Sequence, residues 1–102
     1  MFKINSEPKF EAALTIVGQG REQTLNLTCK HKDKSEYQAL LQSIRDGKTT
    51  PADAVLQLVE KWDADGELNA ASINRLAEQQ PGADWAILEG YWHALVVARK
   101  GN

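Results

Sequence analysis

The chain has 102 residues, of which 42% are hydrophobic, so it is long and apolar enough to bury the core of one domain. Its 12 basic and 14 acidic residues give a formal net charge of -2, which provides no electrostatic basis for binding nucleic acid or an anionic membrane. The single cysteine, Cys29, excludes an intramolecular disulfide. Because the N-terminus carries no apolar leader, and no apolar run approaches the roughly 18 residues that span a bilayer, we expect a cytoplasmic protein.

The N-terminal third alternates apolar and polar residues with a period of two, which predicts a β-hairpin. The inward-facing residues are Phe10, Ala12, Leu14 and Ile16 before the turn, and Leu25, Leu27 and Cys29 after it. Residues 18–21 form the expected loop, which we predict to be longer than two residues. Phe2 and Ile4 continue the alternation before Pro8, so they predict an extension of the first strand or a third strand paired with it. A lone hairpin is marginal in water, so its apolar face must cover helices.

The period then changes to that of amphipathic helices. Ser35 is the expected N-cap of a first helix, which Gly47 ends and whose apolar residues follow i, i+3, i+4, i+7 spacing: Tyr37, Leu40, Leu41 and Ile44. Thr50 and Pro51 predict the start of a second helix that continues to Gly66. The same spacing gives this second helix its apolar residues, Val55, Leu58, Val59 and Trp62.

Two further helices are predicted in the C-terminal part. Asn69 is the expected cap of a short third helix with Ile73, Leu76 and Ala77, and Pro81-Gly82 ends it. Asp84 is the expected cap of the fourth helix, which we predict to continue to about Lys100. The sequence therefore predicts one α+β domain over residues 1–102, with a hairpin region at 2–32 and a helical region at 35–100.

Asp63-Ala64-Asp65-Gly66-Glu67 resembles the start of a calcium-binding EF-hand loop, but we do not expect it to bind an ion. Such a loop needs glycine at position six and a bidentate glutamate at position twelve, where this chain has Leu68 and Asn74. The segment is better explained as an acidic turn before the third helix.

We expect no metal, no cofactor and no catalysis. Cys29, His31 and His93 have no spacing typical of a zinc site, and no serine or threonine lies in a nucleophile-elbow motif. Gly18-Gln19-Gly20 lacks the third glycine of a phosphate-binding loop. We interpret Cys29 as a small core residue and His31 as a surface residue at the end of the hairpin.

The last helix is the one element whose apolar arc is wider than a small core requires. One stripe contains Leu88, Trp92, Leu95 and Val96, and a neighbouring stripe contains Ile87, Tyr91, Ala94 and Val97. Gly90 in the middle of a helix costs about 1 kcal/mol relative to alanine, which indicates close approach by another part of the backbone or core. Either this helix is central and surrounded by the hairpin and the other helices, or part of its arc is left for a partner.

Several of these features together resemble the phage tail assembly chaperone family. They are the Trp62-Asp63…Gly66 turn, the short helix capped by Asn69, Pro81-Gly82-Ala83 and the final aromatic helix, in the order hairpin, helix, helix, turn, helix. The resemblance covers nearly the whole chain and is densest from residue 56 to residue 91.

The resemblance implies a non-enzymatic protein of the host cytoplasm, absent from the mature virion. Such chaperones coat the tape measure protein, a long and mostly helical rod, in many copies and leave as tail tube subunits add. Relatives are often made in a short form and a frameshifted long form, and the ending Gly101-Asn102 is compatible with a short form. The implied partners are the tape measure protein and other copies of this chain.

We expect six residues of the last helix to be exposed for contact with the partner or with another copy: Trp85, Leu88, Tyr91, Trp92, Leu95 and Val96. Trp62 is assigned to the core, at the junction of the second and third helices. The alternative function is a small regulatory or adaptor domain, which would be favoured if Trp85, Tyr91 and Trp92 were all buried within one protomer.

Overall fold

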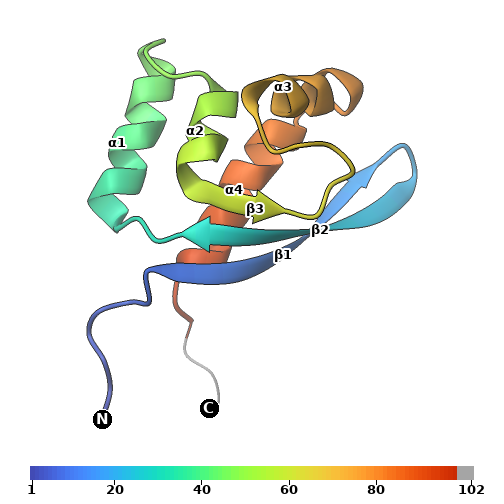
Figure 1. Ribbon diagram of the computed structural model, residues 1–102. Helices are drawn as coiled ribbons and strands as arrows, with labels where there is room; N and C mark the ends of the chain where they lie inside the picture. Colours follow the sequence, from blue (N-terminus) through green and yellow to red (C-terminus); the bar gives the residue numbers. More distant parts are fainter. Residues whose placement is uncertain (99–102) are drawn as a thin grey trace.

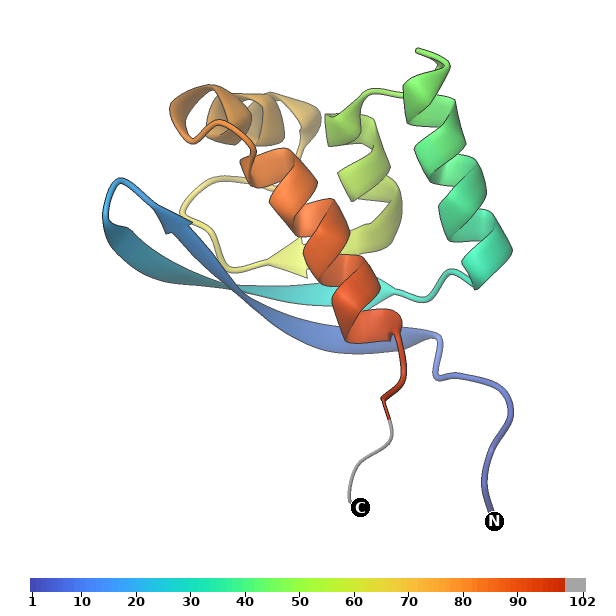
Figure 2. The same cartoon turned by 180° about the vertical axis from the view of Figure 1, so that it is seen from behind.

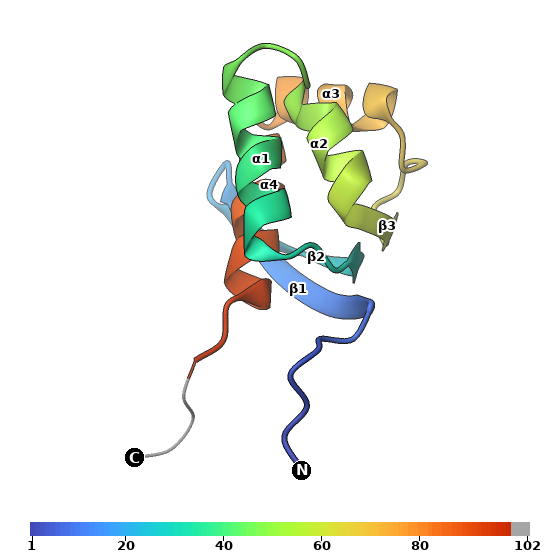
Figure 3. The same cartoon turned by 90° about the vertical axis from the view of Figure 1, so that its left-hand side faces the viewer.

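The computed structural model describes residues 1–98, which form a three-stranded antiparallel sheet and four helices (Figure 1). In chain order the elements are β1 (Lys9–Gly18), β2 (Arg21–Lys30), α1 (Lys34–Arg45), α2 (Pro51–Leu58), β3 (Val59–Trp62), α3 (Ala70–Gln79) and α4 (Ala83–Leu95). The strand order is β1-β2-β3, and the helices lie on one side of the sheet (Figure 3). The predicted α+β class is confirmed. Within these residues, no helix combines the length and apolar character needed to cross a membrane.

The predicted hairpin is formed by β1 and β2, but its turn is tighter than expected. Gly18 pairs with Arg21, so that Gln19 and Gly20 alone make the turn. Their φ angles are 54° and 74°, as in a type I′ turn, whose twist matches that of two paired strands. The expected loop of more than two residues is wrong, because Gln19 adopts the left-handed conformation that this turn requires.

The third strand comes from a segment whose spacing had predicted a helix. α2 ends at Leu58, and Val59 already has extended backbone angles, with φ at -114° and ψ at 126°. β3 then pairs antiparallel with β2 and places Val59 opposite Cys29, with an irregularity beside that pair. The predicted continuation of the helix from Val59 to Gly66 is therefore wrong. The residue spacing fits a helix, but the free edge of β2 offers hydrogen-bond partners that satisfy this backbone as a strand.

The N-terminal segment, residues 1–8, forms no strand and does not pair with β1. Phe2 is 89% exposed and Ile4 is 92% exposed, so the predicted extension or third strand at this position is wrong for the single chain. The backbone N–H of His31 donates to the carbonyl of Pro8 at 2.9 Å, which fixes the segment's last residue beside the end of β2. From there the segment runs away from the helices (Figure 3).

The first helix begins earlier than predicted, because Asp33 caps it in place of Ser35. The Asp33 carboxylate accepts from the Glu36 N–H at 2.8 Å, and the Glu36 carboxylate accepts from the Asp33 N–H at 3.0 Å. This reciprocal capping box satisfies two N–H groups at the start of α1. Gly47, with φ at 73°, ends the helix as predicted. Thr50 caps α2 as predicted, since its hydroxyl accepts from the Asp53 N–H at 3.1 Å.

The predicted cap of α3 is confirmed, and the break before α4 lies where expected. The Asn69 side chain accepts from the Ser72 N–H at 2.8 Å. Gly82, with φ at 91°, stands at the N-cap of α4 in place of the predicted Asp84. Glycine occupies this position because a left-handed residue turns the chain sharply between two helices.

The last helix is shorter than predicted. It ends at Leu95, because Val96 is extended, with φ at -69° and ψ at 128°. The predicted continuation is therefore wrong up to Ala98, and its last residues, Arg99 and Lys100, lie outside the described part of the chain. Beyond this helix end, Val96 and Val97 are 48% and 92% exposed.

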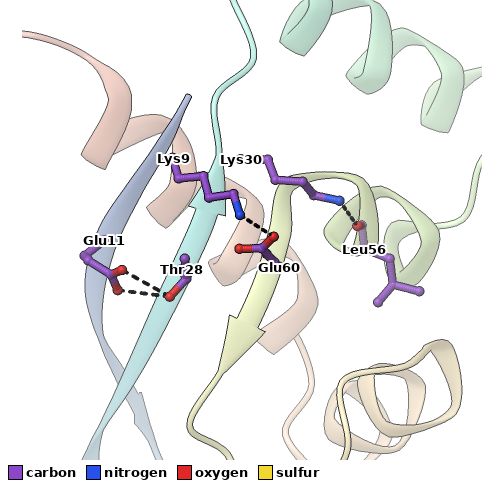
Figure 4. Close-up of polar contacts among 6 residues, drawn as sticks. All are labelled: Lys9, Glu11, Thr28, Lys30, Leu56 and Glu60. Atoms are coloured by element: carbon purple, nitrogen blue, oxygen red, sulfur yellow. Dashed lines mark hydrogen bonds and ion pairs between the residues drawn. The ribbon is translucent and has the colours of Figure 1, made fainter. Parts of the chain in front are cut away.

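The core lies between the inner face of the hairpin and the helices. Its largest fully buried side chains are Leu27, Cys29, Val55, Leu58, Ile73, Ile87, Leu88 and Tyr91. The outer face of the sheet is polar (Figure 4). There Lys9 pairs with Glu60 across β2 at 2.7 Å, and the Thr28 hydroxyl donates to the Glu11 carboxylate at 3.1 Å. Such exposed contacts contribute little to stability, so they keep this face in water rather than hold the fold together.

The loop between β3 and α3 is tied to the sheet by Asp63. One carboxylate oxygen accepts from the Asn26 backbone N–H at 2.8 Å, and the other accepts from the Asn26 side-chain amide at 2.7 Å. These hydrogen bonds, with the side-chain bond the larger cause, hold the pKa of Asp63 below its ordinary value of 3.8. Both carboxylate oxygens are thereby used by the fold.

The Asp63→Asn variant should be less stable than the parent at neutral pH, and its stability should change less than that of the parent as the pH is lowered. Because the folded-state pKa lies below the unfolded value, the bonds stabilise the fold above pH 3.8, and this stabilisation is lost as the pH falls through the folded pKa. Thermal melts across this pH range measure the effect. The neighbouring Asp65→Asn is the matched control and should follow the parent. Equal acid dependence of Asp63→Asn and the parent would contradict the role of this carboxylate.

Gly90 lies where α4 crosses β1, which is the close approach that the sequence indicated. A Cβ atom at this position would lie 2.4 Å from Cδ2 and 3.0 Å from Cγ of Leu14. The missing side chain therefore lets the helix backbone approach the inner face of the hairpin (Figure 2 shows α4 crossing β1).

Gly90→Val should lower the free energy of unfolding by about 2 kcal/mol, because the new side chain must displace Leu14 from its position between sheet and helix. Chemical denaturation measures the change. Ala94→Val introduces the same β-branched residue one helical turn later, at an exposed position, and serves as the control. Helix propensity alone would favour Gly90→Val and disfavour Ala94→Val, so a loss for Gly90→Val no larger than that for Ala94→Val would contradict the packing argument.

Candidate protein-binding face

The six residues predicted to be exposed on the last helix divide into two groups. Leu88 and Tyr91 are wholly buried, so their predicted exposure is wrong: α4 is a central helix that packs on β1, α2 and α3. Trp85 is 40% exposed and Val96 is 48% exposed. The exposed and half-buried members form what we call the α4 patch, consisting of Trp85, Trp92, Leu95 and Val96.

Helical spacing brings the α4 patch together on one side of the helix. Trp85 and Trp92 are seven residues apart, so they follow one another along one stripe of the helix, and Val96 lies just beyond the helix end. Leu88 lies in the same stripe but points into the core. Since Trp85 is partly exposed, the condition that would have favoured an adaptor domain with a fully internal aromatic arc is not met.

Tyr91 fixes how α4 is rotated against the sheet. Its hydroxyl donates to the carbonyl of Lys30 at 2.7 Å and accepts from the backbone N–H of Lys32 at 2.9 Å. These two groups stand at the end of β2 and in the connection to α1. Burial raises the pKa of Tyr91 to about 12, so the hydroxyl stays protonated and keeps its donor. With Tyr91 held in this way, Trp92 must point toward α1.

Stacked aromatic rings support the α4 patch from below. The rings of Tyr37 and Trp92 are 4.7 Å apart at an interplanar angle of 19°, and those of Tyr37 and Tyr91 are 5.8 Å apart at 13°. The Tyr37 hydroxyl donates to the carbonyl of Leu88 at 3.0 Å, in the middle of α4. Because one face of Trp92 is covered by Tyr37, this side chain is presented in a fixed orientation.

The carboxylates of the acidic turn, residues 63–67, do not form an ion-binding site within the described residues. Asp63 uses both of its oxygens on Asn26, and no group of three His, Cys, Asp or Glu side chains in residues 1–98 is placed to hold a metal ion. Trp62 packs against the core as predicted, although it lies on β3 rather than between two helices. Its ring N–H donates to the carbonyl of Gly66 at 2.7 Å and so closes the turn.

Cys29 and His31 have structural surroundings rather than catalytic ones. Cys29 is fully buried, as predicted, and burial together with the charge of Glu11 raises its pKa to about 11. A thiol with that pKa is a poor nucleophile near neutral pH. His31 is half-buried rather than fully exposed, and its buried Nδ1 has no hydrogen-bond partner in the described part of the chain.

Sequence reasoning missed two exposed apolar regions. Val97 was read as part of a longer helix, and Phe2 and Ile4 were read as part of a strand, yet all three are exposed. A signal for Val97 exists: Val96 and Val97 are consecutive β-branched residues, which fit extended backbone better than a helix end.

Tyr91→Phe should lower the free energy of unfolding by about 1–3 kcal/mol, because the Lys30 carbonyl and the Lys32 N–H would both lose their partner in a buried place. Tyr37→Phe is the matched control. It removes one hydroxyl whose acceptor, the Leu88 carbonyl, lies within a helix, so we expect a smaller loss. Chemical denaturation of both variants provides the comparison, and a larger loss for Tyr37→Phe would contradict the role assigned to Tyr91.

Comparison with known proteins assigns the chain to a family. The model of one family, described as phage tail assembly chaperone, matches residues 1–102, from the N-terminal segment to the last residue. The chain has no significant match among curated proteins or among solved structures. The match includes the hairpin, all the described helices and the α4 patch, and it agrees with the resemblance seen in the sequence. The chain therefore belongs to the phage tail assembly chaperone family.

Proposed function

We propose that this chain binds the tape measure protein of a tailed phage and shields it during tail assembly. The observation that carries the proposal is the family match over the whole chain. The proposed chaperone acts without catalysis, in the cytoplasm of the bacterial host, and is absent from the finished virion. The buried, protonated Cys29 is in keeping with a protein that works by contact rather than by covalent chemistry.

The α4 patch supports the proposal because it offers apolar surface on a rigid base. Trp85 and Val96 are 40% and 48% exposed, while Trp92 is held by its stack on Tyr37. Large aromatic side chains in fixed orientations are the residues that contribute most at protein interfaces, because little conformational entropy is lost when a partner covers them.

The partner that fits this surface is an amphipathic helix. A long helical rod exposes one apolar stripe after another until the tail tube encloses it, and exposed stripes of this kind aggregate. An apolar patch can cover such a stripe by helix-in-groove contact. Covering two or three large apolar side chains supports binding of about micromolar strength, which is tight enough to shield and weak enough to release.

Multi-copy association is the second part of the proposal. One patch covers only a short stretch of a rod, so many copies are needed along its length. Copies that contact one another head to tail follow a rod as an open spiral, whereas a symmetric pair would stop at two.

The double variant Trp85→Ser/Val96→Ser should fail to keep the tape measure protein soluble when both are produced together, with binding weakened by about 100-fold. The substitutions remove two exposed apolar side chains and leave the core unchanged. The measurement is the soluble fraction of the tape measure protein, with circular dichroism to confirm that the variant is folded.

Val17→Ser is the control, because it removes an apolar side chain that is 68% exposed on the hairpin. It should keep the tape measure protein soluble. If the double variant performs as well as the parent, the α4 patch is not the contact surface. If the parent chain itself does not hold the tape measure protein, the proposed function is wrong.

A further inference from the structure

β1 has a free edge that runs along the whole hairpin. In residues 1–98, β1 pairs with β2 alone. The pair Gly18 and Arg21 closes a two-residue turn and is hydrogen-bonded, so bonded pairs recur at every second residue from there. The backbone groups that face away from β2 are therefore those of Lys9, Glu11, Ala13, Thr15 and Val17. An edge of this length is a template for another strand.

A groove lies beside this free edge, between β1 and α4. It has a volume of about 420 Å³ and is lined by residues 13–16 of β1 and by Ala86, Glu89, Gly90, His93 and Ala94 of α4. Ala86, Gly90 and Ala94 are spaced one helical turn apart and have small or absent side chains. Leu14 fills the space beside Gly90, and the small side chains of Ala86 and Ala94 leave room for the side chains of an added strand. The groove and the α4 patch occupy different faces of α4, since the helix turns by about 100° per residue.

The chain also carries a segment with the properties of such a strand. Phe2 and Ile4 are 89% and 92% exposed and stand two residues apart, so in an extended segment both side chains point to the same side. Lys3 is positive, whereas Glu89 is exposed at the groove and negative. In its own protomer this segment starts from Pro8 at the end of β2 and runs away from the helices (Figure 3).

We propose that residues 1–7 of one copy add as a strand to the free edge of β1 in a second copy, with Phe2 and Ile4 in the groove against α4. The partner is thus a second copy of this chain, recognised by backbone hydrogen bonds and two apolar side chains. This inference rests on the proposed multi-copy association and identifies its contact. The donating segment and the accepting groove are different surfaces, so each copy can donate to one neighbour and accept from another. The α4 patch stays uncovered for the tape measure protein.

Two variants separate donation from acceptance. Phe2→Ser/Ile4→Ser removes the apolar side chains of the donor segment, which has no role in the core. Thr15→Pro removes an N–H from the free edge and leaves the hydrogen bonds between β1 and β2 in place. Val97→Ser, at a residue that is 92% exposed, is the control for the first variant, and Thr15→Val, which keeps the N–H, is the control for the second.

Sedimentation velocity over a range of concentrations should show growing assemblies for the parent and both controls. Each of the two test variants alone should associate about 100-fold more weakly. An equimolar mixture of the two should form a dimer of one donor and one acceptor and nothing larger, because the mixture retains one intact segment and one intact edge. A symmetric contact between α4 helices could not be restored by mixing.

The inference is overturned if Phe2→Ser/Ile4→Ser assembles like the parent, which does not depend on how well Thr15→Pro folds. It is also overturned if the parent stays monomeric, or if two folded variants form no dimer when mixed. If Thr15→Pro loses the tape measure protein while Phe2→Ser/Ile4→Ser keeps both it and self-association, the groove binds that partner and the inference is wrong. Solubility of the tape measure protein with the parent chain tests the proposed function separately.

Discussion

The two hydrogen bonds of the Tyr91 hydroxyl determine which faces α4 presents. By joining the Lys30 carbonyl and the Lys32 N–H, they fix the helix at the point where the sheet ends and the helical part begins. A helix can slide or rotate on an apolar sheet at little cost, because hydrophobic contact has no direction. Hydrogen bonds do have direction. With Tyr91 fixed, Leu88 must point inward, Trp92 must lie on Tyr37, and Gly90 must face Leu14.

The sides of α4, a helix of 13 residues, thereby face three different environments. Ile87, Leu88 and Tyr91 fill the core, Trp85 and Val96 of the α4 patch are exposed, and the small residues around Gly90 border β1. This division explains why the apolar arc seemed too wide for a core helix. The interpretation of α4 as a central helix is confirmed, whereas a partner for the apolar surface that is still exposed stays a prediction. The absent side chain at Gly90 makes the central position of α4 possible, since it lets the helix approach the sheet closely enough to bury Tyr91.

The sequence predicted the caps of α2 and α3, because caps are local and depend on one or two side chains. Thr50 and Asn69 cap as expected, and the cap of α1 also has a local signal, since Asp33 and Glu36 have the spacing of a capping box. β3 could not be predicted in this way. The spacing of Val59 and Trp62 suits a helix, and what makes it a strand is the edge of β2, some thirty residues earlier in the sequence. The prediction that Leu88 and Tyr91 are exposed was wrong for the same reason, because the side of a helix that is covered depends on neighbours distant in sequence.

Exposure of the N-terminal segment and openness of the β1 edge are two halves of one physical problem. Phe2 and Ile4 leave apolar surface in water, and the edge leaves backbone donors and acceptors without a strand partner. Natural edge strands are usually protected by charges, bulges or a covering segment, because an open edge invites uncontrolled pairing. Pairing between copies would satisfy both needs at once and would be controlled, since one short segment fits one groove. Because such a contact is small, it can be lost one copy at a time. The coat that we propose for the tape measure protein needs that property, because it would have to leave as the tail tube grows.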